Sequence, residues 1–148
     1  MSVYQVYAAY DMLARMKKRC LAPPEGLVVK RSNTGLGLFT TRPIKKNTRV
    51  IEYVGRLVSR EEEYTSRSKY LFEINSRKTI DGKPYLNPAG YINHSCRPNC
   101  EPNVVRGHVF IRTTKNLQPG EELTYDYGKE YFDEHIRPSG CRCAACQS

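Results

Sequence analysis

Residues 91–100 bring several side chains that could do chemistry into one short stretch. It reads Tyr-Ile-Asn-His-Ser-Cys-Arg-Pro-Asn-Cys, so an amide, an imidazole, a hydroxyl and two thiols lie between apolar runs, where neither a strand nor a helix would place them. Asn, His and Ser also cap ordinary turns, and Pro98 ends whatever precedes it, so a plain turn is the alternative interpretation. The density of reactive groups favours a functional site.

A second cluster lies near the C-terminus, where Cys141, Cys143 and Cys146 bring three thiols into six residues. Such a set needs one more sulfur to complete a tetrahedral zinc site. Cys96 is the preferred fourth ligand and Cys100 is its rival. A group of reducible thiols that holds no metal is the alternative interpretation.

Two further stretches combine β character with polar chemistry. Residues 34–38 (Thr-Gly-Leu-Gly-Leu) form a glycine-rich turn that leads into a strand, and the glycines would let the backbone approach a ligand. The turn lacks the third glycine and the following helix of a dinucleotide-binding motif. Residues 120–127 (Gly-Glu-Glu-Leu-Thr-Tyr-Asp-Tyr) are a short β run that ends in two tyrosines.

In order and spacing these four stretches resemble the SET-domain protein lysine methyltransferases, over roughly residues 27–146. The resemblance implies a mostly β fold of small curved sheets with a C-terminal pseudoknot and a C-terminal zinc clip. It also implies transfer of a methyl group from S-adenosylmethionine to a lysine of a protein, with a histone or a similar basic tail as the expected substrate. The alternative is a non-catalytic basic zinc-binding module that docks on nucleic acid or on lysine-bearing tails.

The resemblance also assigns roles to individual residues. Asn93 is expected to bind the amino-acid part of the cofactor, and His94 to hold its adenine, largely through the main chain. The matching cofactor-binding positions are Leu36, Gly37, Tyr70, Asn93, His94 and Tyr127. Gly90 departs from the family pattern, because many relatives have arginine there.

Three tyrosines match the family's lysine channel. Tyr127 is expected to be the catalytic residue beside the transferred methyl, while Tyr53 and Tyr125 line the channel. A tyrosine at position 125 is expected to favour monomethylation. The zinc cluster resembles that of the family, although only two residues separate Cys143 from Cys146 where relatives usually have four.

Hydrophobic periodicity and turn residues predict the elements that position these groups. An N-terminal helix is expected over residues 3–18, and a short helix after Ser59, whose capping box Glu62 would complete. The expected strands span residues 27–31, 36–40, 48–58, 70–74, 78–81, 104–105, 109–111 and 123–127, with a helical turn at 88–90. We expect an N-terminal extension (1–26), a catalytic domain (27–134) and a zinc-binding tail (135–148).

Length and charge limit the function classes. The chain has 148 residues, enough for one domain, and it has 24 Lys and Arg against 15 Asp and Glu. The excess favours weak contact with nucleic acid, although the basic residues fall in several short groups. No apolar window long enough for a membrane span and no secretory signal occur, so we expect an intracellular protein. It would be nuclear or chromatin-associated in a eukaryote, and cytoplasmic or a secreted effector in a bacterium; the oligomeric state stays open.

Overall fold

The fold is known from a computed structural model, which describes residues 21–84 and 86–148. The helix predicted over residues 3–18 lies outside the described residues. The elements in chain order are β1 (Leu27–Ser32), β2 (Gly35–Thr40), β3 (Arg49–Tyr53), β4 (Arg56–Val58), α2 (Arg60–Thr65), β5 (Leu71–Asn75), β6 (Lys78–Asp81), η2 (Pro88–Tyr91), β7 (Asn93–His94), β8 (Cys100–Val105), β9 (His108–Thr113), β10 (Thr124–Tyr125), α3 (Lys129–Tyr131), η3 (Phe132–Ile136), η4 (Arg137–Ser139) and α4 (Ala144–Gln147).

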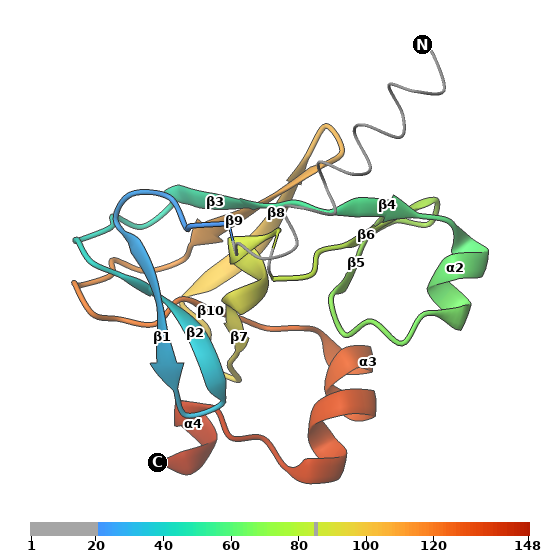
Figure 1. Ribbon diagram of the computed structural model, residues 1–148. Coiled ribbons are helices and arrows are strands. Elements are labelled where there is room, and N and C mark those ends of the chain that lie inside the picture. The colour runs from blue at the N-terminus through green and yellow to red at the C-terminus, as the bar shows by residue number, and fades with distance from the viewer. Residues whose placement is uncertain (1–20, 85) are drawn as a thin grey trace.

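The strands of the described residues form four small sheets (Figure 1). β1 and β2 make an antiparallel hairpin, whereas β3, β9 and β8 make one three-stranded sheet and β4, β6 and β5 make another. β7 and β10 pair in parallel. Between β8 and β9, Arg106 and Gly107 have positive φ angles of 51° and 81°, as a two-residue hairpin turn requires. The predicted mostly β fold is confirmed.

The strand predicted over residues 48–58 is in fact two strands. β3 pairs with β9 and β4 pairs with β6, so the chain changes sheet at Val54 and Gly55. A Cβ atom on Gly55 would lie 2.3 Å from the carbonyl oxygen of Asp81. Because β6 approaches this closely, the position accepts only glycine. The β-branched residues on both sides of Gly55 have the pattern of one continuous strand, so the break was not predicted.

The last strand and the central stretch also differ from their predictions. The strand expected over residues 123–127 shortens to the two residues of β10, and the central stretch, expected to hold no strand, contributes their partner β7. The Leu123 N–H donates to the Leu38 carbonyl at 2.8 Å, and the Thr124 N–H donates to Oδ1 of Asn99 at 2.9 Å. The last segment is therefore enclosed by β2, β7 and the start of β8, all of which precede it in the chain.

The hydrophobic core lies between the sheets and directly behind β7 and β10. Leu38, Ile92, Ile111 and Leu123 are each at most 1% exposed. Burial of such a side chain contributes about 1.5–3 kcal/mol. Ile92 and Leu123 immediately precede β7 and β10, so core packing fixes the backbone of both strands.

Two short helices agree with their predictions. The Ser59 hydroxyl accepts the Glu62 N–H at 3.2 Å, and the Glu62 carboxylate accepts the Ser59 N–H at 3.1 Å, which completes the capping box of α2. The predicted helical turn is the 3₁₀ helix η2. α2 contributes no residue to the two cavities of the site described below, whereas Gly90 of η2 lines one of them.

A helical stretch that the sequence does not predict follows β10. α3, the π-helix η3 and the 3₁₀ helix η4 run without interruption from Lys129 to Ser139, after Gly128 with a φ of 89°. The predicted boundary between residues 134 and 135 falls inside this stretch. It passes below β7 and leads to α4, near the tip of the β1–β2 hairpin (Figure 1). No helix of the described residues has the length and apolar character needed to cross a membrane.

Candidate active site

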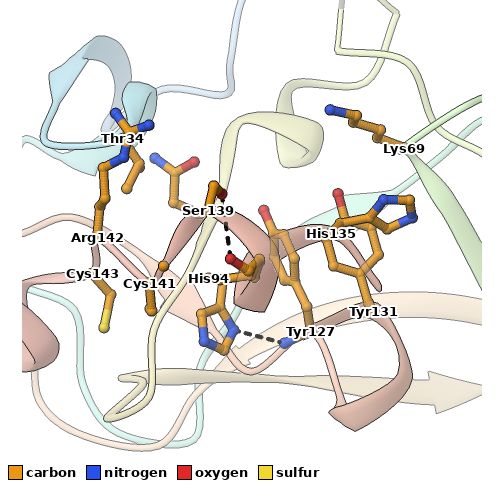
Figure 2. A pocket seen from close by; sticks show the side chains of 13 residues that line it. Thr34, Lys69, His94, Tyr127, Tyr131, His135, Ser139, Cys141, Arg142 and Cys143 are labelled. Atoms are coloured by element: carbon orange, nitrogen blue, oxygen red, sulfur yellow. Dashed lines mark hydrogen bonds between the residues drawn. The ribbon is translucent and has the colours of Figure 1, made fainter. Parts of the chain in front are cut away.

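Two cavities adjoin each other beside the helical stretch, and Lys69, Tyr127 and Tyr131 line both of them. The first has a volume of about 260 Å³ and is also lined by Thr34, Asn93, His94, His135, Ser139, Cys141, Arg142 and Cys143. The second has a volume of about 190 Å³ and is also lined by Tyr53, Tyr70, Phe72, Gly90 and Tyr125. Figure 2 shows Tyr127 and Tyr131 side by side, with His94, Cys141 and Cys143 on one side and Lys69 on the other.

Asn93 is held in one orientation by three acceptors. Its Nδ2 lies 2.7 Å from Oε1 of Glu122, 3.0 Å from the Leu36 carbonyl oxygen and 3.1 Å from Oγ of Ser32. None of these three acceptors belongs to a residue that lines the first cavity. The amide oxygen is therefore left available to a ligand's donor group, such as an ammonium.

His94 joins the tyrosines of the site to the thiol cluster. Its ring lies between Tyr127 and Phe132, at centroid distances of 5.6 and 5.3 Å. Nδ1 accepts the backbone N–H of Tyr127 at 3.2 Å, so the ring proton lies on Nε2, which is 3.5 Å from Sγ of Cys96. Burial lowers the pKa of His94 although the Asp126 carboxylate opposes the shift, so the ring is neutral at neutral pH.

Tyr127 stands at the junction of the two cavities. Its hydroxyl donates to the carbonyl oxygen of Ile92 at 2.6 Å, and its ring meets that of Tyr131 edge-on at a centroid distance of 5.0 Å. Burial raises the pKa of Tyr127 well above its usual value, and the neighbouring Tyr125 and Tyr131 add to the shift. The phenol therefore stays protonated. Because its proton is directed to Ile92, its oxygen lone pairs are available as hydrogen-bond acceptors.

Tyr53 and Tyr125 line the second cavity. Both side chains are buried, and burial raises the pKa of both phenols. The Tyr53 hydroxyl donates to the Tyr70 carbonyl at 2.9 Å, whereas no hydrogen bond engages the Tyr125 hydroxyl within the described residues. Tyr70, predicted beside the cofactor, lines this second cavity and not the first. The second cavity is thus mainly an aromatic pocket, with Lys69 and Asp126 as its charged side chains.

Leu36 and Gly37 act on the first cavity only through Asn93. Leu36 presents its carbonyl oxygen to the Asn93 amide while its side chain is exposed, and neither residue lines the cavity. A Cβ atom on Gly37 would lie 2.3 Å from Oε1 of Glu122 and 3.1 Å from Nδ2 of Asn93. The glycine therefore makes room for a carboxylate of this chain. Direct contact of both residues with a cofactor stays a prediction.

The four predicted zinc ligands lie together. The Sγ atoms of Cys96, Cys141, Cys143 and Cys146 are within 4.8 Å of one another, at 3.8 Å for Cys96–Cys141 and 3.6 Å for Cys96–Cys146. Tetrahedral zinc with Zn–S bonds of about 2.3 Å places its sulfurs about 3.8 Å apart. Burial opposes ionisation of Cys143, but the Cys96 N–H and the neighbouring thiols outweigh it and lower the pKa to about 6. The cluster is compatible with zinc binding.

The short spacing between the last two cysteines is explained by α4. Cys143 caps this helix, and the Cys146 N–H donates to the Cys143 carbonyl at 3.0 Å, so one helical turn brings the two thiols together. The rival ligand Cys100 is 1% exposed in the core and does not belong to the cluster. Burial raises the pKa of the Cys100 thiol to about 12.

Gly90, the departure from the family pattern, is enclosed by a neighbouring loop. A Cβ atom there would lie 2.9 Å from the Gly82 carbonyl oxygen and 3.2 Å from Cα of Pro84. Any side chain at this position requires the loop to move. The chain's own loop therefore fills the space beside the second cavity.

Sequence reasoning missed several residues that line or support the site. Tyr131 and Lys69 line both cavities, His135 lines the first, and Glu122 orients Asn93. Tyr131 and His135 are four residues apart, with rings 4.6 Å apart, because they lie on one side of the unpredicted helical stretch. That i, i+4 spacing after Gly128 was the available signal.

Comparison with known proteins identifies the family. The model of the SET domain matches residues 35–128. The chain is 39% identical over 124 residues to human histone-lysine N-methyltransferase 2D and 38% identical over 125 residues to histone-lysine N-methyltransferase trithorax of Drosophila melanogaster. It is 37% identical over 123 residues to the H3 lysine-4 specific histone-lysine N-methyltransferase of Schizosaccharomyces pombe.

These alignments cover 75%, 76% and 74% of this chain, but only 2%, 3% and 13% of the respective relatives. The shared region is thus a small part of much longer proteins. Since the family model spans more than half of the chain, the chain belongs to the SET-domain family.

The Asn93 site leads to a first prediction. Asn93→Ala removes the acceptor that we expect to bind the cofactor, and a buried partner left unpaired costs about 1–3 kcal/mol. The dissociation constant of S-adenosylmethionine should rise by roughly 5- to 150-fold in calorimetry. Glu122→Ala should weaken binding less, because the amide loses its orientation but not its oxygen, and Glu121→Ala next to it should have no effect. Equal affinity for Asn93→Ala and wild type would remove this residue from the cofactor site.

Proposed function

We propose that the chain is an S-adenosylmethionine-dependent protein lysine N-methyltransferase that acts on a histone or a similar basic tail. The observation that carries this proposal is the pair of adjoining cavities, one polar around Asn93 and one aromatic around Tyr53 and Tyr125, which meet at Tyr127. The names of the relatives support the reaction class. A docking module that does not catalyse would not need two cavities that meet at a phenol.

The polar cavity fits the cofactor's chemistry. The Asn93 oxygen suits its ammonium group, and the side chains of Lys69 and Arg142 at the cavity wall suit its carboxylate. When bound, S-adenosylmethionine would supply a methyl group on a sulfonium sulfur. A third cavity of about 220 Å³ shares Asn93, His94 and Arg142 with the first and extends the space for the rest of the molecule.

The aromatic cavity prepares the lysine. Its amine must be neutral to accept a methyl, and deprotonation at pH 7 from a reference pKa near 10.4 costs roughly 4.6 kcal/mol. The buried rings of Tyr53 and Tyr125 desolvate the ammonium form and so reduce this cost. The phenols stay protonated, so they offer no phenolate that would hold the proton on the amine, and Asp126 is the one carboxylate that lines this cavity.

Tyr127 positions the reacting groups at the junction. Its hydroxyl proton goes to Ile92, so its oxygen can accept hydrogen bonds from the lysine amine and from polarised C–H groups. It thereby holds these two reacting groups close to each other and in line. A protonated phenol does not act as the base at neutral pH. The lysine ammonium therefore loses its proton to water before the methyl group is transferred.

We also propose one zinc ion per chain, held by Cys96, Cys141, Cys143 and Cys146. The ion would join the tail to the central stretch, and Cys141 and Cys143 already line the first cavity. His94 supports the cluster from outside, because its Nε2–H faces Cys96. The zinc site would thus form one wall of the cofactor cavity.

A methylation assay tests the proposed activity. The purified chain is incubated with methyl-labelled S-adenosylmethionine and a histone mixture, and the products are read by mass spectrometry. We expect a mass increase of one methyl on lysine and none on arginine. Tight cofactor binding without methyl transfer to histones or to total cell protein would support the alternative of a docking module and contradict the proposed methyltransferase activity.

The number of methyl groups provides a further prediction. Tyr125 is 8% exposed, and its unpaired hydroxyl occupies the space that a methylated amine needs in order to turn. The wild type should therefore stop mainly at monomethyl-lysine. Tyr125→Phe removes one oxygen and should shift the products toward di- and trimethyl-lysine while the first transfer continues. A wild type that already yields trimethyl-lysine would show that Tyr125 does not limit the product.

A further inference from the structure

Five cationic residues lie on two neighbouring segments that contribute no residue to the two cavities of the site. The basic face consists of these residues, Arg42, Lys45, Lys46, Arg49 and Lys115. It is formed by the β2–β3 and β9–β10 connections, which an isolated bridge between Ile44 and Leu117 holds side by side. The two connections lie at the left edge of Figure 1, away from α3.

The basic face has a net positive charge. Residues 41–49 and 113–118 contain no Asp or Glu. The ion pairs found among residues 21–84 and 86–148 all use other cations. Side chains that are scattered along the sequence are thus brought together by the fold, which the sequence alone did not predict.

The backbone under the basic face is already ordered. The Lys46 N–H donates to Oδ1 of Asn116 at 2.8 Å, and the Thr113 hydroxyl donates to the Lys45 carbonyl at 2.7 Å. Asn47 holds the turn with a φ of 65°, which asparagine tolerates better than most residues. A ligand therefore meets cations on a fixed backbone, and little backbone entropy is lost on binding.

The basic face is also concave. Arg42, Lys45 and Arg49 line a cavity of about 430 Å³, with Glu25 as its one carboxylate. The Arg49 guanidinium lies 5.1 Å from the centre of the Phe110 ring, which restricts its movement. Cations around a hollow focus the positive potential toward an incoming anion.

We propose that the basic face binds the phosphate backbone of nucleic acid. The closely spaced phosphates of a duplex can engage several fixed cations at once, whereas an acidic peptide must be ordered first. A second reason rests on the proposed function: a chain with a formal charge of +9 and a lysine-rich substrate repel each other. A polyanion attracts both and so brings the enzyme to substrates that lie on nucleic acid.

The test is binding to a labelled 20-base-pair DNA duplex, measured by fluorescence anisotropy across a salt series. Lys45, Lys46 and Lys115 are changed together to Gln. The control changes Arg67, Arg77 and Lys78 to Gln; these exposed cations lie on or near the β4–β6–β5 sheet, and the net charge changes by the same amount. Thermal unfolding verifies that both variants are folded.

The basic-face variant should bind the duplex about tenfold or more weakly than the wild type at about 50 mM salt. The slope of its log affinity against log salt concentration should fall in magnitude by about 2 to 3, because each phosphate that the protein neutralises adds about 0.9 to that slope. The control should stay within about twofold of the wild type. Equal weakening of both variants would overturn the proposal, because net charge alone would explain the binding. Equal competition by poly-glutamate would overturn it in favour of an acidic protein partner. No catalysis is measured, so an inactive chain does not affect the outcome.

Discussion

Tyr127→Phe should lower turnover by more than about tenfold while the cofactor dissociation constant stays within about twofold of wild type. The hydroxyl that this change removes stands where the two cavities meet and donates to the Ile92 carbonyl at 2.6 Å. The ring should stay in place, because Tyr125 and Tyr131 pack against it. An interaction that matters chiefly in the transition state affects rate more than binding. Single-turnover rates and calorimetry on the same protein measure the two quantities separately.

A matched variant shows whether the effect belongs to the site. Tyr64 on α2 is 79% exposed, so Tyr64→Phe removes a hydroxyl far from both cavities and should leave turnover and melting temperature unchanged. If Tyr127→Phe turns over as fast as the wild type, Tyr127 has no catalytic role. If its cofactor affinity falls as much as its rate, the phenol serves binding.

Removal of the metal should abolish most of the activity before the core unfolds. Three of the four proposed ligands lie in the last eight residues, and the tail they hold forms a wall of the first cavity. The sheets have their own core, so a chelator should release the tail while the strands keep their hydrogen-exchange protection. Metal analysis should find one equivalent of zinc in protein purified without chelator. Less than about half an equivalent would contradict the zinc site.

Two cysteine variants identify the fourth ligand. Cys96→Ala should lose the zinc, and its methylation rate should therefore fall by more than about tenfold. Cys100→Ala should keep a full equivalent of zinc and lose only some stability, because Cys100 packs in the core. The opposite pattern would make Cys100 the ligand. A chain that ends at Ser139 and remains fully active would show that the tail is not needed.

Much of the fold could be predicted because local signals agreed with it. The β1–β2 and β8–β9 hairpins have their turn residues where the chain reverses, and Ser59 with Glu62 specified the cap of α2. The break at Gly55 could not be predicted, since it depends on the approach of β6 from elsewhere in the sequence. The helical stretch after Gly128 was missed because two of its inward residues, Tyr131 and His135, are polar and obscure the apolar pattern of Phe132 and Ile136.

The site, like the fold, has parts that the sequence predicts and parts that depend on distant segments of the chain. Asn93, His94, the channel tyrosines and the cysteines were recognisable through the family resemblance, and the structure places them around the two cavities and in the thiol cluster. Glu122 was not recognisable, because its place beside Asn93 exists only once Gly37 leaves room for it. A glycine that was expected to make room for a ligand makes room for a side chain 85 positions later, and only coordinates reveal such a pairing.

The parallel pairing of β7 with β10 has a consequence for biosynthesis. This pairing and the hydrogen bond from the Tyr127 N–H to His94 join segments far apart in the chain, and such non-local contacts form slowly during folding. Synthesis proceeds from the N-terminus, so β7 leaves the ribosome before β10, the tyrosines that follow β7 and three of the four clustered thiols. Until they arrive, Leu38 and Ile92 lack their covering segment and are exposed to chaperones or to aggregation. The proposed methyltransferase activity therefore requires that the residues through Cys146, the last proposed zinc ligand, have left the ribosome.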